Sequence, residues 1–118
     1  DKGTKIALVT ARRRFSVDSI LDNLHLAGYF STVVCAEDKV KHKPDPEPAL
    51  VALKNMGVAA QNAVMVGDSP YDVGCGKAAG CTAAGVTWGM ADAETLKKAG
   101  SHNIFNKAQD LSDWLLSL

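Results

Sequence analysis

Short apolar runs alternate along this chain with segments in which apolar residues recur every three or four positions. The runs are rich in valine and alanine and lie at 6–10, 32–36, 63–67 and 82–87, with a weaker one at 103–105. Near-continuous apolar strands separated by helices are typical of a parallel sheet that is covered on both faces. The pattern therefore predicts an α/β fold with right-handed crossovers between parallel strands.

The segments between the runs carry helix start and stop signals. Their predicted buried stripes are Val17, Ile20, Leu21 and Leu24, then Ala49, Leu50, Leu53 and Met56, and finally Leu111, Trp114, Leu115 and Leu118. Ser16 and Asp45 are the expected N-caps of the first two helices, and Gly28 and Gly57 their expected ends. Helices on both faces of a parallel sheet make a Rossmann-like arrangement, which we expect to be a single domain over 1–118.

Composition limits the possible partners and the compartment. Of the 118 residues, 47% are hydrophobic, which supports a buried core. Thirteen basic and thirteen acidic residues cancel, so no bulk attraction to nucleic acid or to a membrane surface is expected. No apolar run approaches the ~20 residues that span a bilayer. Three cysteines without C-x-x-C spacing favour a reducing, cytoplasmic compartment over disulfides or a zinc site.

A glycine-rich segment at 74–80 has the spacing G-x-G-x-x-x-G. Dinucleotide-binding loops join a strand to a helix, whereas this segment lies within a predicted helix. We therefore expect its small residues to allow close packing of that helix on the sheet.

The segment from Gly67 to Asp72, Gly-Asp-Ser-Pro-Tyr-Asp, carries the clearest chemical signal. A buried strand that stops at Gly-Asp delivers the Asp68 carboxylate to the carboxyl edge of the sheet. Ser69 is the expected N-cap of the next helix, so Asp72 falls in its first turn, close to Asp68. Two such carboxylates suit a hard cation such as Mg²⁺. A plain turn before a capped helix fits the same residues, and the motif alone leaves both interpretations open.

Two further polar residues stand at comparable places in the chain. Thr10 ends the first strand, and Lys43 precedes the helix start at Asp45. A hydroxyl, an ammonium group and carboxylates in this order form a set that can bind phosphate and metal. Thr10 could instead simply terminate a strand, and Lys43 could be one of several solvated loop charges. Pro44 favours an ordered role, because it restricts Lys43 to an extended backbone.

In these residues the chain resembles the haloacid dehalogenase (HAD) superfamily of phosphatases. Thr10 matches the second motif of that superfamily, Lys43 the third, and Asp68 with Asp72 the fourth. The Lys-Pro-Asp-Pro-Glu and Val-Gly-Asp-Ser segments are most similar to phosphoglycolate phosphatases. The resemblance implies Mg²⁺-dependent hydrolysis of a small phosphorylated substrate through an aspartyl-phosphate intermediate.

The same resemblance implies roles for individual residues. The implicated residues are Thr10, Ala11 and Lys43 for phosphate, Asp68 and Asp72 for Mg²⁺, and Ser69 as a hydrogen-bonding support of the metal ligands. Thr10 and Lys43 are also the implied catalytic residues, since they would bind and neutralise the phosphoryl group. Asp68 would hold the ion directly, and Asp72 would act through water. Thr87-Trp88-Gly89 follows another strand and is expected either to line the entrance or to place Trp88 under a loop.

The chain departs from the superfamily pattern at the first motif, Asp-x-Asp-x-Thr, which supplies the nucleophile and is not found in the sequence. Asp1-Lys2-Gly3-Thr4 is rejected as a substitute, because it precedes a strand instead of ending one. We therefore expect this chain to be the C-terminal part of a HAD core, without its first strand and cap. The expected partner is an upstream segment of the same protein, and the chain alone would be inactive. Strands 6–10 and 63–67 should then lie about 9–10 Å apart, two strand spacings.

Three other functions remain open from the sequence. A β-phosphoglucomutase-like mutase would share all of the motifs discussed above. A receiver-like signalling module uses similar groups, but it places its acidic pair first and its lysine late, which is the reverse of the order here. A non-catalytic remnant that binds phosphate or a partner is the third alternative.

Overall fold

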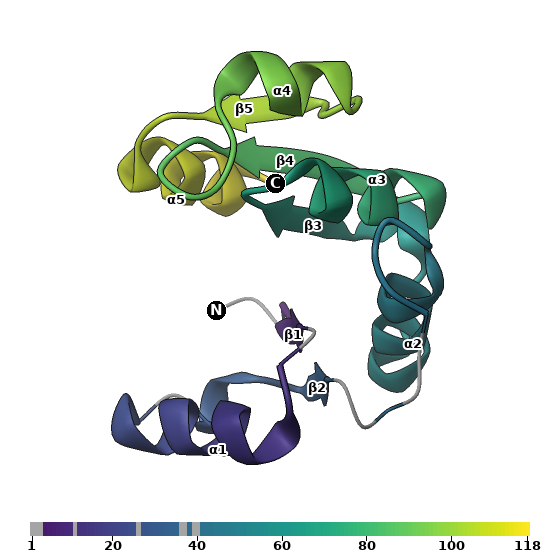
Figure 1. Cartoon of the computed structure of the whole chain (residues 1–118), viewed down its shortest axis with the longest axis vertical. Coiled ribbons are helices and arrows are strands. Elements are labelled where there is room, and N and C mark those ends of the chain that lie inside the picture. Colours follow the sequence, from purple (N-terminus) through teal and green to yellow (C-terminus); the bar gives the residue numbers. More distant parts are fainter. Residues whose placement is uncertain (1–3, 11, 26, 36–37, 39–40) are drawn as a thin grey trace.

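The computed structural model describes residues 4–10, 12–25, 27–35, 38 and 41–118. Its strands run parallel and form two sheets, in the orders β1-β2 and β3-β4-β5 (Figure 1). The strands are β1 (Ala7–Val9), β2 (Thr32–Val34), β3 (Val64–Gly67), β4 (Thr82–Val86) and β5 (Asn103–Phe105). Each of the predicted apolar runs contains one of them, so the predicted α/β fold with parallel strands is confirmed.

The two sheets are not joined to each other by backbone pairing. In the first sheet, Leu8 is paired with Val33. In the second, β4 has neighbours on both sides, and its residues from Ala83 onward are buried. Among the described strands, β1 pairs only with β2 and β3 only with β4. The predicted split between the first strand and the strand that ends at Gly67 is therefore present.

The helices are α1 (Arg14–Asn23), α2 (Glu47–Met56), α3 (Pro70–Ala78), α4 (Ala93–Lys98) and α5 (Ala108–Ser117), with short 3-10 turns η1 (Ala27–Tyr29) and η3 (Ala60–Asn62). Helix α2 packs against both strands of the first sheet and also against α3, which covers β3 and β4. It therefore connects the two sheets, as its position at the side of the molecule in Figure 1 shows. No described helix is long and apolar enough to cross a membrane.

Each sheet has its own small core. In the first, Val17, Leu21 and Cys35 form a buried cluster. In the second, the buried cluster joins α3, β4 and α4. Its members are Val73, Ala83 and Leu96, with Ile104 and two partly buried alanines against them. The apolar interior is thus divided in the same way as the strands.

The helix boundaries confirm some start and stop predictions and correct others. Helix α1 begins after Arg13, so Ser16 lies inside the helix, and the prediction that it is the N-cap was wrong. The helix also ends at Asn23, well before Gly28. At α2 the N-cap position falls on Pro46 and has no side-chain cap hydrogen bond, so the prediction that Asp45 is the N-cap was wrong by one residue. Asp45 still supports this helix start, because its Oδ1 atom accepts a hydrogen bond from the Glu47 amide at 2.9 Å. The predicted end at Gly57 is confirmed, since Gly57 closes the helix with φ of 68°.

The predicted buried stripes are only partly buried. Val17 and Leu21 are enclosed, whereas Ile20 and Leu24 on the same helix are exposed. Leu50 of α2 is exposed as well, and so are Leu115 of α5 and Leu118, which directly follows that helix. The physical reason is that α1 packs on a sheet of two short strands and α5 packs on the edge strand β5, so neither sheet face is wide enough to cover a whole stripe.

The glycine-rich segment has the packing role that its position predicted. A Cβ atom at Gly76 would lie 2.7 Å from the Met65 Cγ atom, so the absence of a side chain lets α3 approach β3 closely. Gly80 follows the helix with φ of 93°, in agreement with its expected role as a stop. Helix α4 was not predicted from the sequence.

Candidate active site

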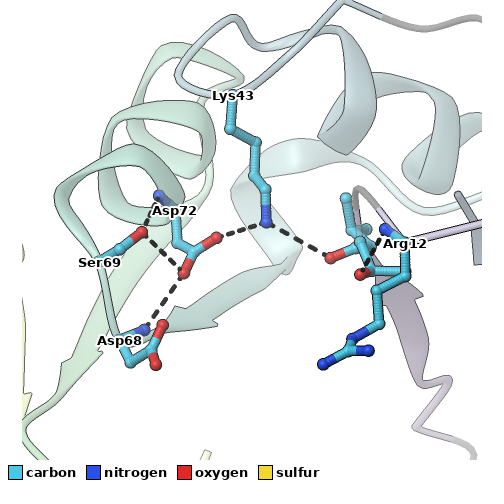
Figure 2. Close-up of polar contacts among 7 residues, drawn as sticks. Arg12, Lys43, Asp68, Ser69 and Asp72 are labelled. Carbon is cyan, nitrogen blue, oxygen red and sulfur yellow. Dashed lines mark hydrogen bonds and ion pairs between the residues drawn. The ribbon is translucent and has the colours of Figure 1, made fainter. Parts of the chain in front are cut away.

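Strand β3 ends at Gly67 and delivers Asp68 to the carboxyl edge of the second sheet (Figure 2). A Cβ atom at Gly67 would lie 2.6 Å from the Asp72 Cγ atom, closer than real Cβ atoms approach. The glycine therefore allows the first turn of α3 to fold back over the strand end. This close approach brings the two aspartates of the motif together.

A reciprocal set of hydrogen bonds fixes the start of α3. The Ser69 hydroxyl oxygen accepts a hydrogen bond from the Asp72 amide at 3.2 Å. The same hydroxyl donates its hydrogen to Asp72 Oδ2 at 3.1 Å. The Asp68 amide also donates to Asp72 Oδ2, at 3.2 Å. The predicted cap at Ser69 is confirmed, and the arrangement is close to a capping box.

Lys43 is the polar link between the two sheets. Its Nζ atom donates to Asp72 Oδ1 at 2.5 Å and lies 3.5 Å from the carbonyl oxygen of Val9, at the end of β1 (Figure 2). Only 20% of the Lys43 side chain and 13% of the Asp72 side chain are exposed. A pair so far withdrawn from water is held in place by its surroundings, so Lys43 is not a solvated loop charge.

Lys41 provides the contrast within the same loop. It is an exposed residue whose amide donates to Glu47 Oε1 at 2.6 Å. Beyond Lys43, the Pro44 ring packs on α3, since a Cβ atom at Gly74 would lie 2.9 Å from the Pro44 Cβ atom. The loop that carries Lys43 is therefore fixed on the second sheet's side.

Thr10 follows β1 directly, and its amide donates to the Val34 carbonyl at 2.9 Å. Its Oγ1 atom accepts a hydrogen bond from the Arg12 amide at 3.2 Å, so the chain turns at this point. Thr10 is next to Val9, whose carbonyl faces Lys43. Ala11, the other predicted phosphate-binding residue, lies outside the described residues.

The two aspartates have different partners. Oδ1 of Asp72 accepts a hydrogen bond from Lys43 Nζ, and Oδ2 accepts hydrogen bonds from the Asp68 amide and the Ser69 hydroxyl. Asp68 instead faces the loop after β4, where Met90 donates its amide hydrogen to Asp68 Oδ2 at 3.1 Å. The Ala91 amide donates to the Asp68 carbonyl at 2.9 Å. The sequence did not indicate these contacts; the only signal was a glycine, Gly89, soon after a strand end.

The charge of this cluster suits a cation and a phosphoryl group together. Within the described part of the chain, no group of three or more His, Cys, Asp and Glu side chains is placed to hold a metal on its own. Mg²⁺ is commonly bound by one or two carboxylates, with waters and substrate phosphate completing its shell. Asp68 and Asp72 could supply that number, and the Lys43 ammonium group could attract the phosphate.

Cys75 lies behind this cluster, on α3, and is fully buried. Burial raises the pKa of the Cys75 thiol, although the charge of Lys43 acts in the opposite direction. A thiol that is protonated and enclosed is a poor nucleophile. Cys75 is therefore a packing residue.

The sequence of this chain is similar to those of known proteins. A family model described as haloacid dehalogenase-like hydrolase matches residues 1–86. Phosphoglycolate phosphatase of Escherichia coli strain K12 is 36% identical over 110 residues, which cover 93% of this chain and 44% of that protein. A candidate pyrophosphatase, PpaX, of Caldanaerobacter subterraneus is 41% identical over 98 residues, or 83% of this chain and 44% of that protein.

A solved structure gives the same result for the fold. The crystal structure of a candidate β-phosphoglucomutase from Thermotoga maritima superimposes with a TM-score of 0.88 at 29% identity, and the match covers 99% of this chain and 55% of that one. The chain thus spans about half the length of the proteins that it matches.

Proposed function

The chain belongs to the haloacid dehalogenase-like hydrolase family, and from that premise we propose that it forms the phosphate- and Mg²⁺-binding part of a phosphohydrolase. The substrate would be a small phosphorylated metabolite such as phosphoglycolate. The observation that carries the proposal is the position of Lys43, whose ammonium group lies between the end of β1 and Asp72. A cation held there can neutralise charge on a transferring phosphoryl group.

In this proposal Lys43 and Thr10 bind the phosphoryl group. Lys43 Nζ keeps one donor for a phosphoryl oxygen while Asp72 holds the ammonium group in place. The Thr10 hydroxyl accepts the Arg12 amide and can donate its own hydrogen to another phosphoryl oxygen. Ala11 follows Thr10 and is proposed to offer its amide to the same group.

The acidic residues fit Mg²⁺ in two different ways. Among the described contacts, the Asp68 carboxylate uses Oδ2 for the Met90 amide, which leaves Oδ1 for a cation. Asp72 already accepts hydrogen bonds at both oxygens, so it suits contact through water. Ser69 supports Asp72. When bound, Mg²⁺ would neutralise phosphoryl charge and orient the group.

The nucleophile is proposed to lie on a further strand of the same polypeptide. Strands β1 and β3 each have a single described neighbour, and their residues are apolar. A strand inserted between them would satisfy the unpaired backbone groups of both. Its carboxyl end would then stand beside Thr10, Lys43 and Asp68. An aspartate carboxylate there could attack the phosphorus atom while the phosphorus–oxygen bond to the substrate breaks, and the departing oxygen takes up a proton to leave as an alcohol. Water would then hydrolyse the aspartyl phosphate and release inorganic phosphate.

The test is a steady-state phosphatase assay of the full-length gene product with Mg²⁺ and phosphoglycolate. Lys43→Met should lower the rate at least ~10²-fold, as expected for one electrostatic stabiliser, whereas Lys41→Met, the matched control, should change it little. Asp68→Ala should abolish Mg²⁺-dependent turnover, while Asp72→Asn should leave a measurable rate. Near-full activity of the Asp68→Ala protein would exclude the metal assignment, and equal effects of the two lysine changes would exclude the role of Lys43.

Mutase activity is the second candidate, favoured by the superposition on the Thermotoga maritima structure. A mutase moves phosphate between two positions of one sugar, whereas a phosphatase releases it. Phosphorus NMR of the wild-type protein with β-glucose 1-phosphate separates the two activities. Conversion to another sugar phosphate without inorganic phosphate would favour the mutase, and complete inactivity would favour a non-catalytic binding role.

A further inference from the structure

The loop between β4 and α4, residues 87–92, lies against Asp68 and hydrogen-bonds to it through two backbone amides. The Met90 amide donates to Asp68 Oδ2 at 3.1 Å, and the Ala91 amide donates to the Asp68 carbonyl at 2.9 Å. The side chains of Trp88 and Met90 are exposed. The exposed Trp88 side chain excludes the expectation that it packs under a loop, and the contribution of this loop to the site is made by its main chain.

Gly89 occupies the position of closest approach. A Cβ atom at Gly89 would lie 2.7 Å from the Asp68 Cγ atom and closer still to Oδ2, distances that real Cβ atoms do not adopt. Gly89 is not among the glycines with positive φ, which are Gly57, Gly80 and Gly100. An alanine is therefore compatible with its backbone, and the requirement for glycine comes from the space that the Asp68 carboxylate fills.

Both ends of the loop are anchored, one on the segment of β5 and the other on helix α4. The Thr87 amide donates to the Phe105 carbonyl at 3.1 Å, and the Thr87 hydroxyl lies 2.8 Å from Asn106 Oδ1. At the other end, Asp92 caps α4 by accepting the Thr95 amide at 2.9 Å. The loop therefore presents the Met90 amide from a fixed frame.

We infer that Gly89 and the Met90 amide are positioning elements that hold Oδ2 of Asp68 and so direct Oδ1 to a divalent cation. The inference rests on the proposed function, in which Asp68 binds Mg²⁺. A ligand oriented before the ion arrives needs no reordering on binding, and loss of such supporting contacts typically weakens metal binding 10–100-fold. Gly89 acts through Asp68 and does not touch the ion.

The experiment measures Mn²⁺ binding by electron paramagnetic resonance, with the full-length gene product and no substrate. Gly89→Ala should raise the Mn²⁺ dissociation constant about 10–100-fold. Gly28→Ala is the matched control, because a Cβ atom there meets nothing within 4 Å, and its dissociation constant should equal that of the wild type. Gly28→Ala should unfold at the wild-type temperature without metal, whereas Gly89→Ala should unfold at a lower one, because Asp68 must shift to admit the added Cβ atom. A purely structural role of Gly89 would lower that temperature but leave the Mn²⁺ dissociation constant of the folded protein unchanged.

Paramagnetic broadening of amide NMR signals locates the ion independently. In the wild type, Mn²⁺ should broaden the Met90 amide at low ion concentration. If it does, and Gly89→Ala binds as tightly as wild type, the positioning role is wrong while the proposed cation site stands. If the wild type shows neither saturable binding nor broadening at Met90, the proposed metal role of Asp68 fails, and the inference fails with it. Should Gly89→Ala not fold, Met90→Pro removes the amide donor and must show the same weakening.

Discussion

The two sheets of this chain differ in how far the described residues enclose them. Strand β4 is paired on both sides, is buried from Ala83 to Val86, and lies under α3 and α4. Strands β1 and β2 pair only with each other, and most of their residues are half-buried. A two-stranded sheet is marginal in water, whereas three strands with helices packed on them are stable.

The helices that cover β4 also differ from α1 in how their first turns are capped. Helices α3 and α4 begin with side-chain caps, at Ser69 and Asp92. Helix α1 begins after Arg13 without a side-chain cap hydrogen bond, and α2 also begins without one. Helix α5, on the edge strand β5, also lacks such a cap. The helices that cover β4 therefore have starts defined by their own sequence, whereas the first sheet packs against helices without side-chain caps and has the proposed strand beside β1. Lys43 contacts both, so the proposed chemistry requires the two sheets to be held together.

The largest expected effect comes from truncating one leucine in each core. Leu96 is fully buried against Val73 and Ala83, and Leu96→Ala should lower the opening free energy of the β4 amides by about 2–5 kcal/mol. Leu21→Ala removes the same atoms from the first core and should destabilise the amides of α1 and β2 instead. Native-state hydrogen exchange of the full-length gene product measures both.

The decisive comparison is the protection of the β4 amides in the two leucine variants. Leu21→Ala should leave the β4 amides within about 0.5 kcal/mol of wild type, since independent sites do not couple. If it lowers their protection as much as Leu96→Ala does, the two sheets unfold as one cooperative unit, and the distinction between them is wrong.

Local chemistry explains what the sequence could predict. The apolar runs became strands because valine and alanine runs of that length bury well in a parallel sheet. Ser69, Pro70 and Asp72 fix the start of α3 through contacts within four residues of one another, so the cap could be recognised without knowledge of the fold. The end of α2 at Gly57 could be recognised locally as well, because a left-handed glycine commonly closes a helix.

The features that escaped prediction depend on partners distant in the chain. Met90 meets Asp68 across 22 positions, and no local pattern marks the amide that makes the contact. The exposure of Ile20 and Leu50 depends on how much sheet lies beneath their helices, which periodicity does not report. Helix α4 has only six residues, too few for a clear apolar stripe.

Matched serine substitutions sharpen the comparison of helix starts. Ser69→Ala should cost about 1 kcal/mol of unfolding free energy, because the Asp72 amide loses its acceptor. Ser16→Ala lies inside α1, where alanine is the better helix former, and should change the free energy by no more than about 0.5 kcal/mol. Urea unfolding at pH 7 without metal measures both. Equal losses would mean that Ser16 caps α1 after all.

The smallest expected effect is a pH dependence confined to the first sheet. The pKa of Asp38 is lowered from 3.8, chiefly by the Cys35 amide, which donates to its Oδ2 atom at 2.7 Å, and further by the Arg14 guanidinium at 3.2 Å. Because the folded pKa lies below the unfolded one, this contact stabilises the fold above about pH 4 and is lost as the pH falls through the folded value.

Asp38→Asn should therefore destabilise the first sheet at pH 6, by a few tenths of a kcal/mol because the pair is partly exposed. The difference should shrink as the pH falls through the folded pKa of Asp38, because the protonated carboxyl loses the charge on which the contact depends. Asp92→Asn is the counterpart in the second sheet, since the Thr95 amide lowers the pKa of Asp92 in the same way, and it should affect only α4. Exchange at β2 and α4 amides, labelled at each pH, distinguishes them. A loss at β2 that does not shrink as the pH is lowered from 6 would show that Asp38 acts by shape and not by charge.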